Sequence, residues 1–131
     1  MNTLSATLTS VTASEHLSLL TVLVGEDPFY LLLAQHCHEP IGTSLTLVFK
    51  ETEVIVTTTK TATTANIQRA LVRTIEQGKV LSQITLIYQA TPIVTLVPTV
   101  TLATLLIHEG DEVYWMVQPS EISLLRETNG I

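Results

Sequence analysis

The chain has 131 residues, of which 46% are hydrophobic and 14% are charged, and its formal net charge is −6 at pH 7. Its six lysine and arginine residues are scattered, which argues against broad nucleic-acid binding, because neutralising phosphates requires a concentrated basic surface. The longest apolar stretches, such as residues 29–34, are far shorter than the roughly 20 residues of a membrane helix, so we expect no membrane span.

The first residues and the cysteine content favour the cytoplasm. Residues 1–14 lack the basic start and the apolar block of a secretory signal. The single cysteine, Cys37, cannot form a disulfide within the chain, which fits a reducing compartment. We therefore expect a cytoplasmic protein.

The sequence contains two copies of one unit. A segment that begins at Asn2 recurs at Asn66, a shift of 64 positions (66 − 2). The identical pairs at this shift are Asn2 and Asn66, Ala6 and Ala70, Leu17 and Leu81, Ser18 and Ser82, Thr21 and Thr85, Pro28 and Pro92, and Leu32 and Leu96. After an insertion in the second copy the shift becomes 68 (110 − 42), which pairs Gly42 with Gly110. A repeat of this length indicates a duplicated small domain, because a solenoid repeat contains only one or two elements.

Short apolar runs rich in strand-forming residues predict β-strands in both copies. The predicted strands cover residues 4–8, 17–24 and 45–49 in the first copy and 70–75, 81–88 and 112–117 in the second. Turn-forming residues interrupt them at 25–28, 40–42, 77–79 and 109–111, at intervals typical of hairpins. About five strands in each copy would make an all-β chain of two small barrels.

One short helix and one linker complete the predicted organisation. Residues 101–107 place leucines on one helical face, and Thr101 can cap the first turn. The threonine-rich segment 59–64 has no apolar periodicity and suits an extended linker. We therefore expect a first domain at residues 1–58 and a second at 65–131.

Several motifs of the second copy follow one another in a distinctive order. Asn66 opens a strand, a Gly-containing hairpin at 75–82 precedes the next strand, and a Gly-containing turn lies within 105–113. This order resembles that of the Mop, or TOBE, domain of molybdate-binding proteins. The first copy resembles the same domain, with its turn at 41–43 and its closing motif at 49–54. The whole chain thus resembles a tandem, or di-Mop, protein. This resemblance implies OB-like barrels and a homotrimer that holds molybdate or tungstate at domain and subunit interfaces.

The closing motif of the family, Lys-x-Ser or Lys-x-Thr, implies oxyanion ligands in this chain. Lys50 and Thr52 occupy these positions in the first copy, whereas the second copy has Gln118 and keeps only Ser120. A tetrahedral dianion accepts hydrogen bonds and donates none, so its site must present N–H groups, hydroxyls and a cation. The N-terminus of a helix that starts at Thr101 could add free backbone N–H groups.

The arginine that precedes the opening Asn in family members is absent from both copies. Lys60, or Arg69 and Arg73 on the predicted strand, could supply the missing positive charge, although a strand could also leave them in solvent. Family members have Ser-Ala-Arg before the opening Asn, and Thr63 stands at the serine position of this motif. The candidate oxyanion ligands are therefore Lys50, Thr52, Lys60, Thr63, Thr101 and Ser120.

Other functions compete with oxyanion binding. His36, Cys37 and His38 could bind zinc or copper, since imidazole and thiolate are good ligands for these metals. A ligand-sensing or protein-interaction module, derived from a molybdate-responsive regulator or transporter, is a further alternative. The sequence lacks a Gly-x-Ser-x-Gly elbow, a phosphate loop and a Gly-x-Gly-x-x-Gly turn, so we expect no enzyme and no organic cofactor. The favoured hypothesis is a free-standing protein for oxyanion storage or homeostasis.

Overall fold

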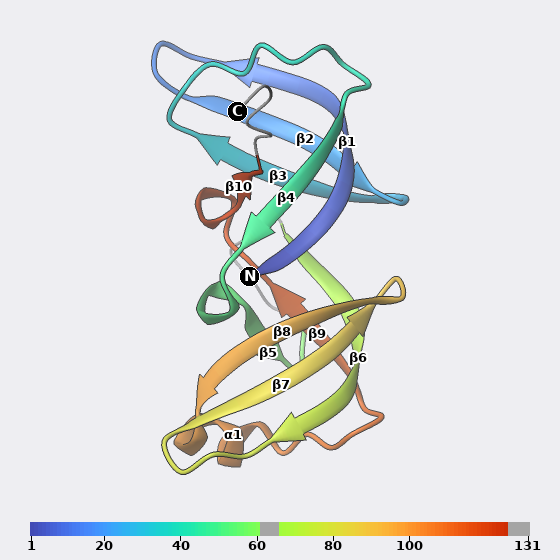
Figure 1. The fold of residues 1–131 in the computed structure, drawn as a ribbon, viewed down its shortest axis with the longest axis vertical. Coiled ribbons are helices and arrows are strands. Elements are labelled where there is room, and N and C mark those ends of the chain that lie inside the picture. Colours follow the sequence, from blue (N-terminus) through green and yellow to red (C-terminus); the bar gives the residue numbers. More distant parts are fainter. Residues whose placement is uncertain (61–65, 126–131) are drawn as a thin grey trace, which may run out of the picture.

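The computed structural model describes residues 1–60 and 66–125. Two five-stranded antiparallel sheets follow each other along the long axis of the molecule, and one short α-helix lies at the far end of the second sheet (Figure 1). The expected mostly-β fold with one short helix is thereby confirmed. No helix in the described part of the chain is long and apolar enough to cross a membrane.

The elements follow the order of the duplicated sequence. The first copy forms β1 (Asn2–Ala13), β2 (Ser18–Val24), β3 (Asp27–Leu33), β4 (Ser44–Phe49), the 3-10 turn η1 (Glu51–Glu53) and β5 (Ile55–Thr57). The second copy forms β6 (Ile67–Glu76), β7 (Leu81–Tyr88), β8 (Thr91–Pro98), α1 (Thr99–Leu105), β9 (Glu112–Met116), the 3-10 turn η2 (Pro119–Glu121) and β10 (Ser123–Leu124). Every strand assigned from the sequence lies within or overlaps an observed strand.

The turn predicted at residues 25–28 is too long. Gly25, with a φ of +60°, belongs to the turn, but Asp27 already pairs with Val24 as the first residue of β3. Pro28 follows it within the same strand. A proline is tolerated here because β3 is the edge strand of its sheet, where a missing N–H need not break a ladder.

Each sheet contains one strand from the other copy of the sequence. The strand order is β10-β4-β1-β2-β3 in the first sheet and β5-β9-β6-β7-β8 in the second. β5, which ends the first copy, therefore pairs with β9, and β10, which ends the second copy, pairs with β4. The predicted linker lies mostly in residues 61–65, outside the described residues, and the limits of the two domains stay a prediction. The description of each sheet as a closed OB-like barrel is also left as a prediction, because the strand order of each sheet is open.

The helix starts earlier than predicted. It spans Thr99–Leu105 instead of residues 101–107, with Pro98 at the N-cap position. The backbone N–H of Thr99 donates to the carbonyl oxygen of Val80 at 2.8 Å, which fixes the first helical residue against the β6–β7 hairpin. Thr101 is therefore an exposed residue inside the helix and not its cap.

The duplication is visible in the geometry of equivalent turns. The N–H of Gly42 donates to the carbonyl oxygen of Leu8 at 2.8 Å, and the N–H of Gly110 donates to that of Val72 at 2.7 Å. Both glycines have positive φ, +96° and +90°. Both opening strands, β1 and β6, also contain a register shift directly after the residue that accepts this bond. The two copies therefore share backbone detail as well as sequence.

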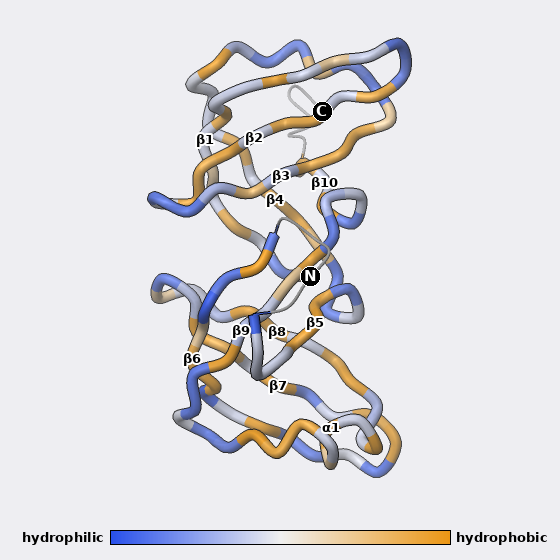
Figure 2. Tube along the Cα trace, turned by 180° about the vertical axis from the view of Figure 1, so that it is seen from behind, coloured by the Kyte–Doolittle hydropathy of each residue, from blue (hydrophilic) through white to orange (hydrophobic). Residues whose placement is uncertain are grey.

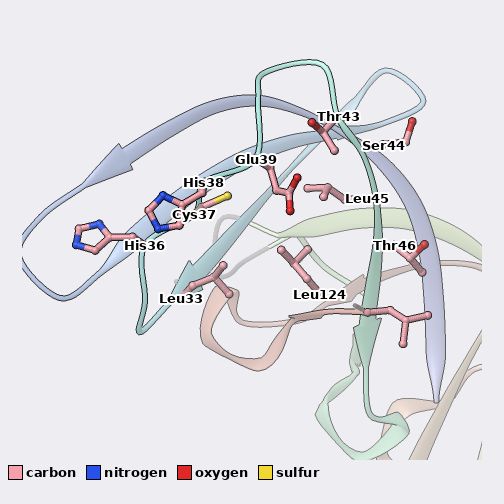
Figure 3. A pocket seen from close by; sticks show the side chains of 11 residues that line it. Leu33, His36, Cys37, His38, Glu39, Thr43, Ser44, Leu45, Thr46 and Leu124 are labelled. Carbon is pink, nitrogen blue, oxygen red and sulfur yellow. The ribbon is translucent and has the colours of Figure 1, made fainter. Parts of the chain in front are cut away.

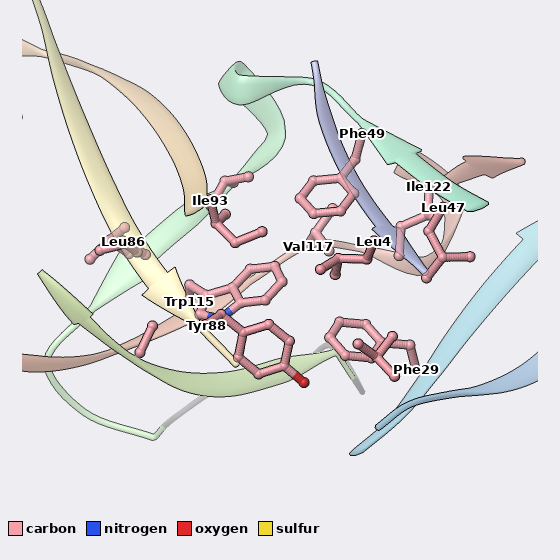
Figure 4. Packing of buried hydrophobic residues seen from close by; sticks show 14 of the residues in the cluster. Leu4, Phe29, Leu47, Phe49, Leu86, Tyr88, Ile93, Trp115, Val117 and Ile122 are labelled. Atoms are coloured by element: carbon pink, nitrogen blue, oxygen red, sulfur yellow. The ribbon is translucent and has the colours of Figure 1, made fainter. Parts of the chain in front are cut away.

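One hydrophobic core connects the two sheets. Trp115 in β9 is fully buried, and its ring centroid lies 5.8 Å from those of Phe29 and Phe49 and 5.2 Å from that of Tyr88 (Figure 4). Phe29 and Phe49 belong to the first copy and the other two rings to the second. Hydrophobic and hydrophilic positions alternate along the strands (Figure 2), which directs one side of each strand into this core.

Candidate oxyanion-binding junctions

The two 3-10 turns lie near the middle of the long axis, between the sheets (Figure 1). η1 packs against β8, and η2 packs against β3. We call η1 with the preceding Lys50 and the facing β8 the first junction, and η2 with the preceding Gln118 and the facing β3 the second junction. Each junction thus combines a turn from one copy of the sequence with an edge strand from the other copy.

The backbone conformation of the two turns is nearly the same. Lys50 has φ −77° and ψ 149°, and Gln118 has φ −68° and ψ 144°. The N–H of Glu53 donates to the carbonyl oxygen of Lys50 at 3.0 Å, and the N–H of Glu121 donates to that of Gln118 at 2.9 Å. The closing motifs of the two copies therefore present their side chains on equivalent scaffolds.

An asparagine side chain ties each junction together. Asn2 donates through Nδ2 to the carbonyl oxygen of Val94 in β8, and its Oδ1 accepts the N–H of Val94, both at 2.8 Å. Asn66 bonds in the same way to Tyr30 in β3, at 2.8 Å and 2.7 Å. Both asparagines are buried. Sequence reasoning used these residues to align the repeat and to recognise the opening of the family motif, and it missed this role, although their recurrence at the opening of both copies was the available signal.

The structure brings part of the predicted ligand set together. Lys50 directly precedes η1, and Thr52 lies inside it; both side chains are exposed. Ser120 is exposed in η2, at the position that corresponds to Thr52. An ammonium group and a hydroxyl thus share the first junction, whereas the second junction has a hydroxyl beside the amide of Gln118.

Acidic groups also lie in the first junction. The N-terminal ammonium group of Met1 lies 3.0 Å from Oε1 of Glu51. This contact, together with the backbone N–H of Glu51, lowers the pKa of the Glu51 carboxyl below its ordinary value. Behind the turn, Oγ1 of the buried Thr95 donates to the carbonyl oxygen of Val54 at 2.7 Å, which fixes the end of η1 against β8.

The other candidate ligands that the structure describes are not part of either junction. Thr101 lies in α1, at the far end of the second sheet (Figure 1). Lys60 is exposed and belongs to no helix or strand, and Thr63 lies outside the described residues. Arg69 is engaged elsewhere, because its Nη1 is 3.7 Å from Glu112 and its guanidinium carbon is 5.8 Å from the centre of the Tyr114 ring. Arg73 is an exposed residue of β6.

His36, Cys37 and His38 line an open pocket of about 550 Å³ in the first copy (Figure 3). The pocket lies where the second copy has α1, because the first copy has a shorter, irregular loop there. The ring centroids of the two histidines are 6.2 Å apart. In residues 1–60 and 66–125, no three His, Cys, Asp or Glu side chains are placed to hold one metal ion. The geometry therefore gives the metal alternative no support.

The shorter loop also leaves a buried hydroxyl without its partner. In the second copy, Oγ of Ser82 bonds to Oγ1 of Thr99, the first residue of α1, at 2.7 Å. The equivalent Oγ of Ser18 is buried and has no hydrogen-bond partner in the part of the chain that the structure describes. The missing helix thus accounts for this difference between the copies.

Comparison with known proteins gives one result that decides the fold. No protein-family model and no curated protein matches the chain. Among solved structures, the chain is similar to the cytoplasmic molybdate-binding protein ModG, in a crystal form with molybdate bound; the TM-score is 0.87, the identity is 22%, and the match covers 94% of each chain. The chain has the di-Mop fold. The resemblance drawn from the sequence motifs is thereby confirmed for the fold. The fold does not specify the ligand, because one fold can carry different binding sites.

Proposed function

We propose that this protein binds molybdate or tungstate as an intact oxyanion, for storage or homeostasis of the ion in the cytoplasm. The observation that carries the proposal is the first junction, where Lys50 and Thr52 share one turn in a di-Mop fold. ModG, which has the same fold, is a molybdate-binding protein. The proposal involves no catalysis, no organic cofactor, no nucleic acid and no membrane.

The chemistry of the first junction suits a tetrahedral dianion. The Lys50 ammonium supplies a positive charge and hydrogen-bond donors, and the Thr52 hydroxyl supplies another donor. Within residues 1–60 and 66–125, neither side chain makes a salt bridge or a side-chain hydrogen bond, and both are exposed, so they are accessible to a ligand. Ser120 would contribute a hydroxyl at the second junction.

We further propose that the binding unit is a homotrimer. Lys50, Thr52 and Ser120 are all exposed. Pockets of about 550, 530, 320 and 390 Å³ lie elsewhere on the chain, and none of these four is lined by any of the three residues. A dianion held by one chain would therefore stay in contact with water, and the surrounding charges would be screened. Packing of further copies around the junctions would shield the ligand and strengthen its hydrogen bonds.

Native mass spectrometry with separate additions of molybdate, tungstate and sulfate tests this function. We expect a trimer that takes up molybdate or tungstate and does not take up sulfate at the same concentration. Lys50→Gln should weaken uptake about 10- to 100-fold, as expected for loss of a charged hydrogen-bond donor. Lys79→Gln is the matched control, because Lys79 is exposed in the β6–β7 turn, away from both junctions. A monomer that takes up no oxyanion would reject the proposal.

A further inference from the structure

We infer that the two junctions are not equivalent and that the first junction alone holds a doubly charged oxyanion. This inference rests on the proposed function and assigns that function to one of two structurally matched places. The backbone conformation does not distinguish them, since the turns have the same hydrogen bond and similar dihedral angles. The difference must therefore come from the residues at equivalent positions of the two turns and from the strand that each turn faces.

The first difference is the residue before each turn. Lys50 carries a positive charge and three N–H donors, whereas Gln118 is neutral and has two. Hydrogen bonds from an ionised donor to an anion are roughly twice as strong as those between neutral groups. A dianion also loses a large hydration energy when it is bound, which a neutral amide does little to replace. The first junction therefore has the only cationic side chain in the two turns and their preceding residues.

The second difference lies in the backbone. Pro119 opens η2, and a proline has no N–H group. Glu51 stands at the equivalent position of η1 and keeps its N–H, which in this structure interacts with the Glu51 carboxyl. The turn of the second junction therefore has one backbone N–H fewer, in addition to the missing cation.

The third difference is the charge that surrounds each turn. At the first junction, Glu51 and Glu53 are accompanied by Lys50 and by the Met1 ammonium group, and the facing β8 contains no ionisable residue. At the second junction, Glu121 is the charged residue of η2, and neither Gln118 nor the facing β3 contains a lysine or an arginine. The negative charge of Glu121 is therefore not offset within this junction, and it repels a dianion.

Two backbone amides can report on the junctions separately. The N–H of Val94 is bonded to Asn2 at the first junction, and the N–H of Tyr30 is bonded to Asn66 at the second. In an NMR titration of the full chain with molybdate, we expect the Val94 amide signal to shift with saturation and the Tyr30 signal to stay in place. Equal shifts of both signals with the same midpoint would overturn the inference and leave the proposed function standing. A shift of neither signal would reject the proposed function itself.

A gain of binding tests the cause. The double variant Gln118→Lys/Pro119→Ala gives the second turn the cation and the backbone N–H of the first turn without a further negative charge. We expect the Tyr30 amide to respond to molybdate in this variant, and the number of bound oxyanions per chain in native mass spectra to double. An unchanged Tyr30 signal and an unchanged stoichiometry would overturn the inference. Lys79→Gln again serves as the control, with the wild-type response of both amides.

Discussion

Asn2 and Val94 are joined by two hydrogen bonds of 2.8 Å, although 92 positions separate them in the sequence. The Asn2 amide pairs with the backbone of the edge strand β8 as a further strand would. Asn66 does the same to Tyr30 on β3. The duplication therefore produced two reciprocal contacts in which each copy of the sequence closes part of the edge of the other sheet.

Removal of either asparagine side chain should destabilise the protein. Asn2→Ala leaves the N–H and the carbonyl oxygen of Val94 without these partners in a partly buried place, and an unsatisfied buried group costs about 1–3 kcal/mol. We expect Asn2→Ala and Asn66→Ala each to lower the free energy of unfolding by about 2 kcal/mol, measured by urea denaturation. Thr3→Ala, at the exposed neighbour of Asn2, should change it by less than about 0.5 kcal/mol. Equal effects of Asn2→Ala and Thr3→Ala would contradict the role given to Asn2.

Tyr88 should make the protein sensitive to alkaline pH. Burial, followed by the 2.6 Å hydrogen bond that its hydroxyl donates to Asp27, raises the pKa of Tyr88 above its ordinary value of 10.0. The raised pKa means that the unfolded chain releases this proton first. The contribution to stability is therefore complete below about pH 10 and is lost as the pH rises toward the folded pKa, by about 1.4 kcal/mol per pH unit.

Denaturation at a series of pH values between about 9 and 11 checks this expectation, because the tyrosine of the unfolded chain titrates near 10. Tyr88→Phe should remove this alkaline slope and cost about 1 kcal/mol at neutral pH, the typical value of a lost hydrogen bond. Tyr114→Phe should keep the slope, since Tyr114 lies partly exposed beside Arg69. An identical slope in the wild-type protein and in Tyr88→Phe would show that Tyr88 does not cause it.

The two sheets should unfold together. Phe49 of the first copy stacks on Trp115 of the second, with ring planes 15° apart, and each sheet contains a strand from the other copy. Phe49→Ala should therefore cost about 3–5 kcal/mol and lower the stability of both sheets at once. Fluorescence of Trp115, the single tryptophan, and far-UV circular dichroism should give the same transition. Val80→Ala, at an exposed position, is the control, and two separate transitions would disprove the coupling.

The two equivalent glycine turns should respond alike to substitution. At Gly42 and Gly110 an added Cβ meets no atom within 4 Å, so only the positive φ opposes a side chain. We expect Gly42→Ala and Gly110→Ala each to cost about 1 kcal/mol. Gly78→Ala should cost more, because its Cβ would overlap the backbone carbonyl oxygen of Leu81. Thermal denaturation of the three variants measures this order, and the reverse order would refute it.

Much of the fold followed from local patterns in the sequence. Period-two alternation placed residues 4–8 on β1, and the apolar run at 81–88 matched β7. The sequence patterns predict no strand at β3, and the predicted turn at 25–28 includes Asp27 and Pro28 because both are turn-forming residues, whereas the pairing of Asp27 with Val24 places them in the strand. The start of α1 was misplaced for a similar reason, since the bond from Thr99 to Val80 fixes it and no local pattern records that bond.

The sequence by itself determined the duplication, the mostly-β class and the likeness to di-Mop proteins, because these depend on residue identities and on spacings along the chain. Only the tertiary structure decided that β5 and β10 each join the sheet formed by the other copy and that the side chains of Asn2 and Asn66 hydrogen-bond to the other copy. It also decided that Thr101 lies apart from Lys50. Each of these results depends on pairing between segments far apart in the sequence. Such pairing is selected by the burial of a shared core around Trp115, which no single segment can specify.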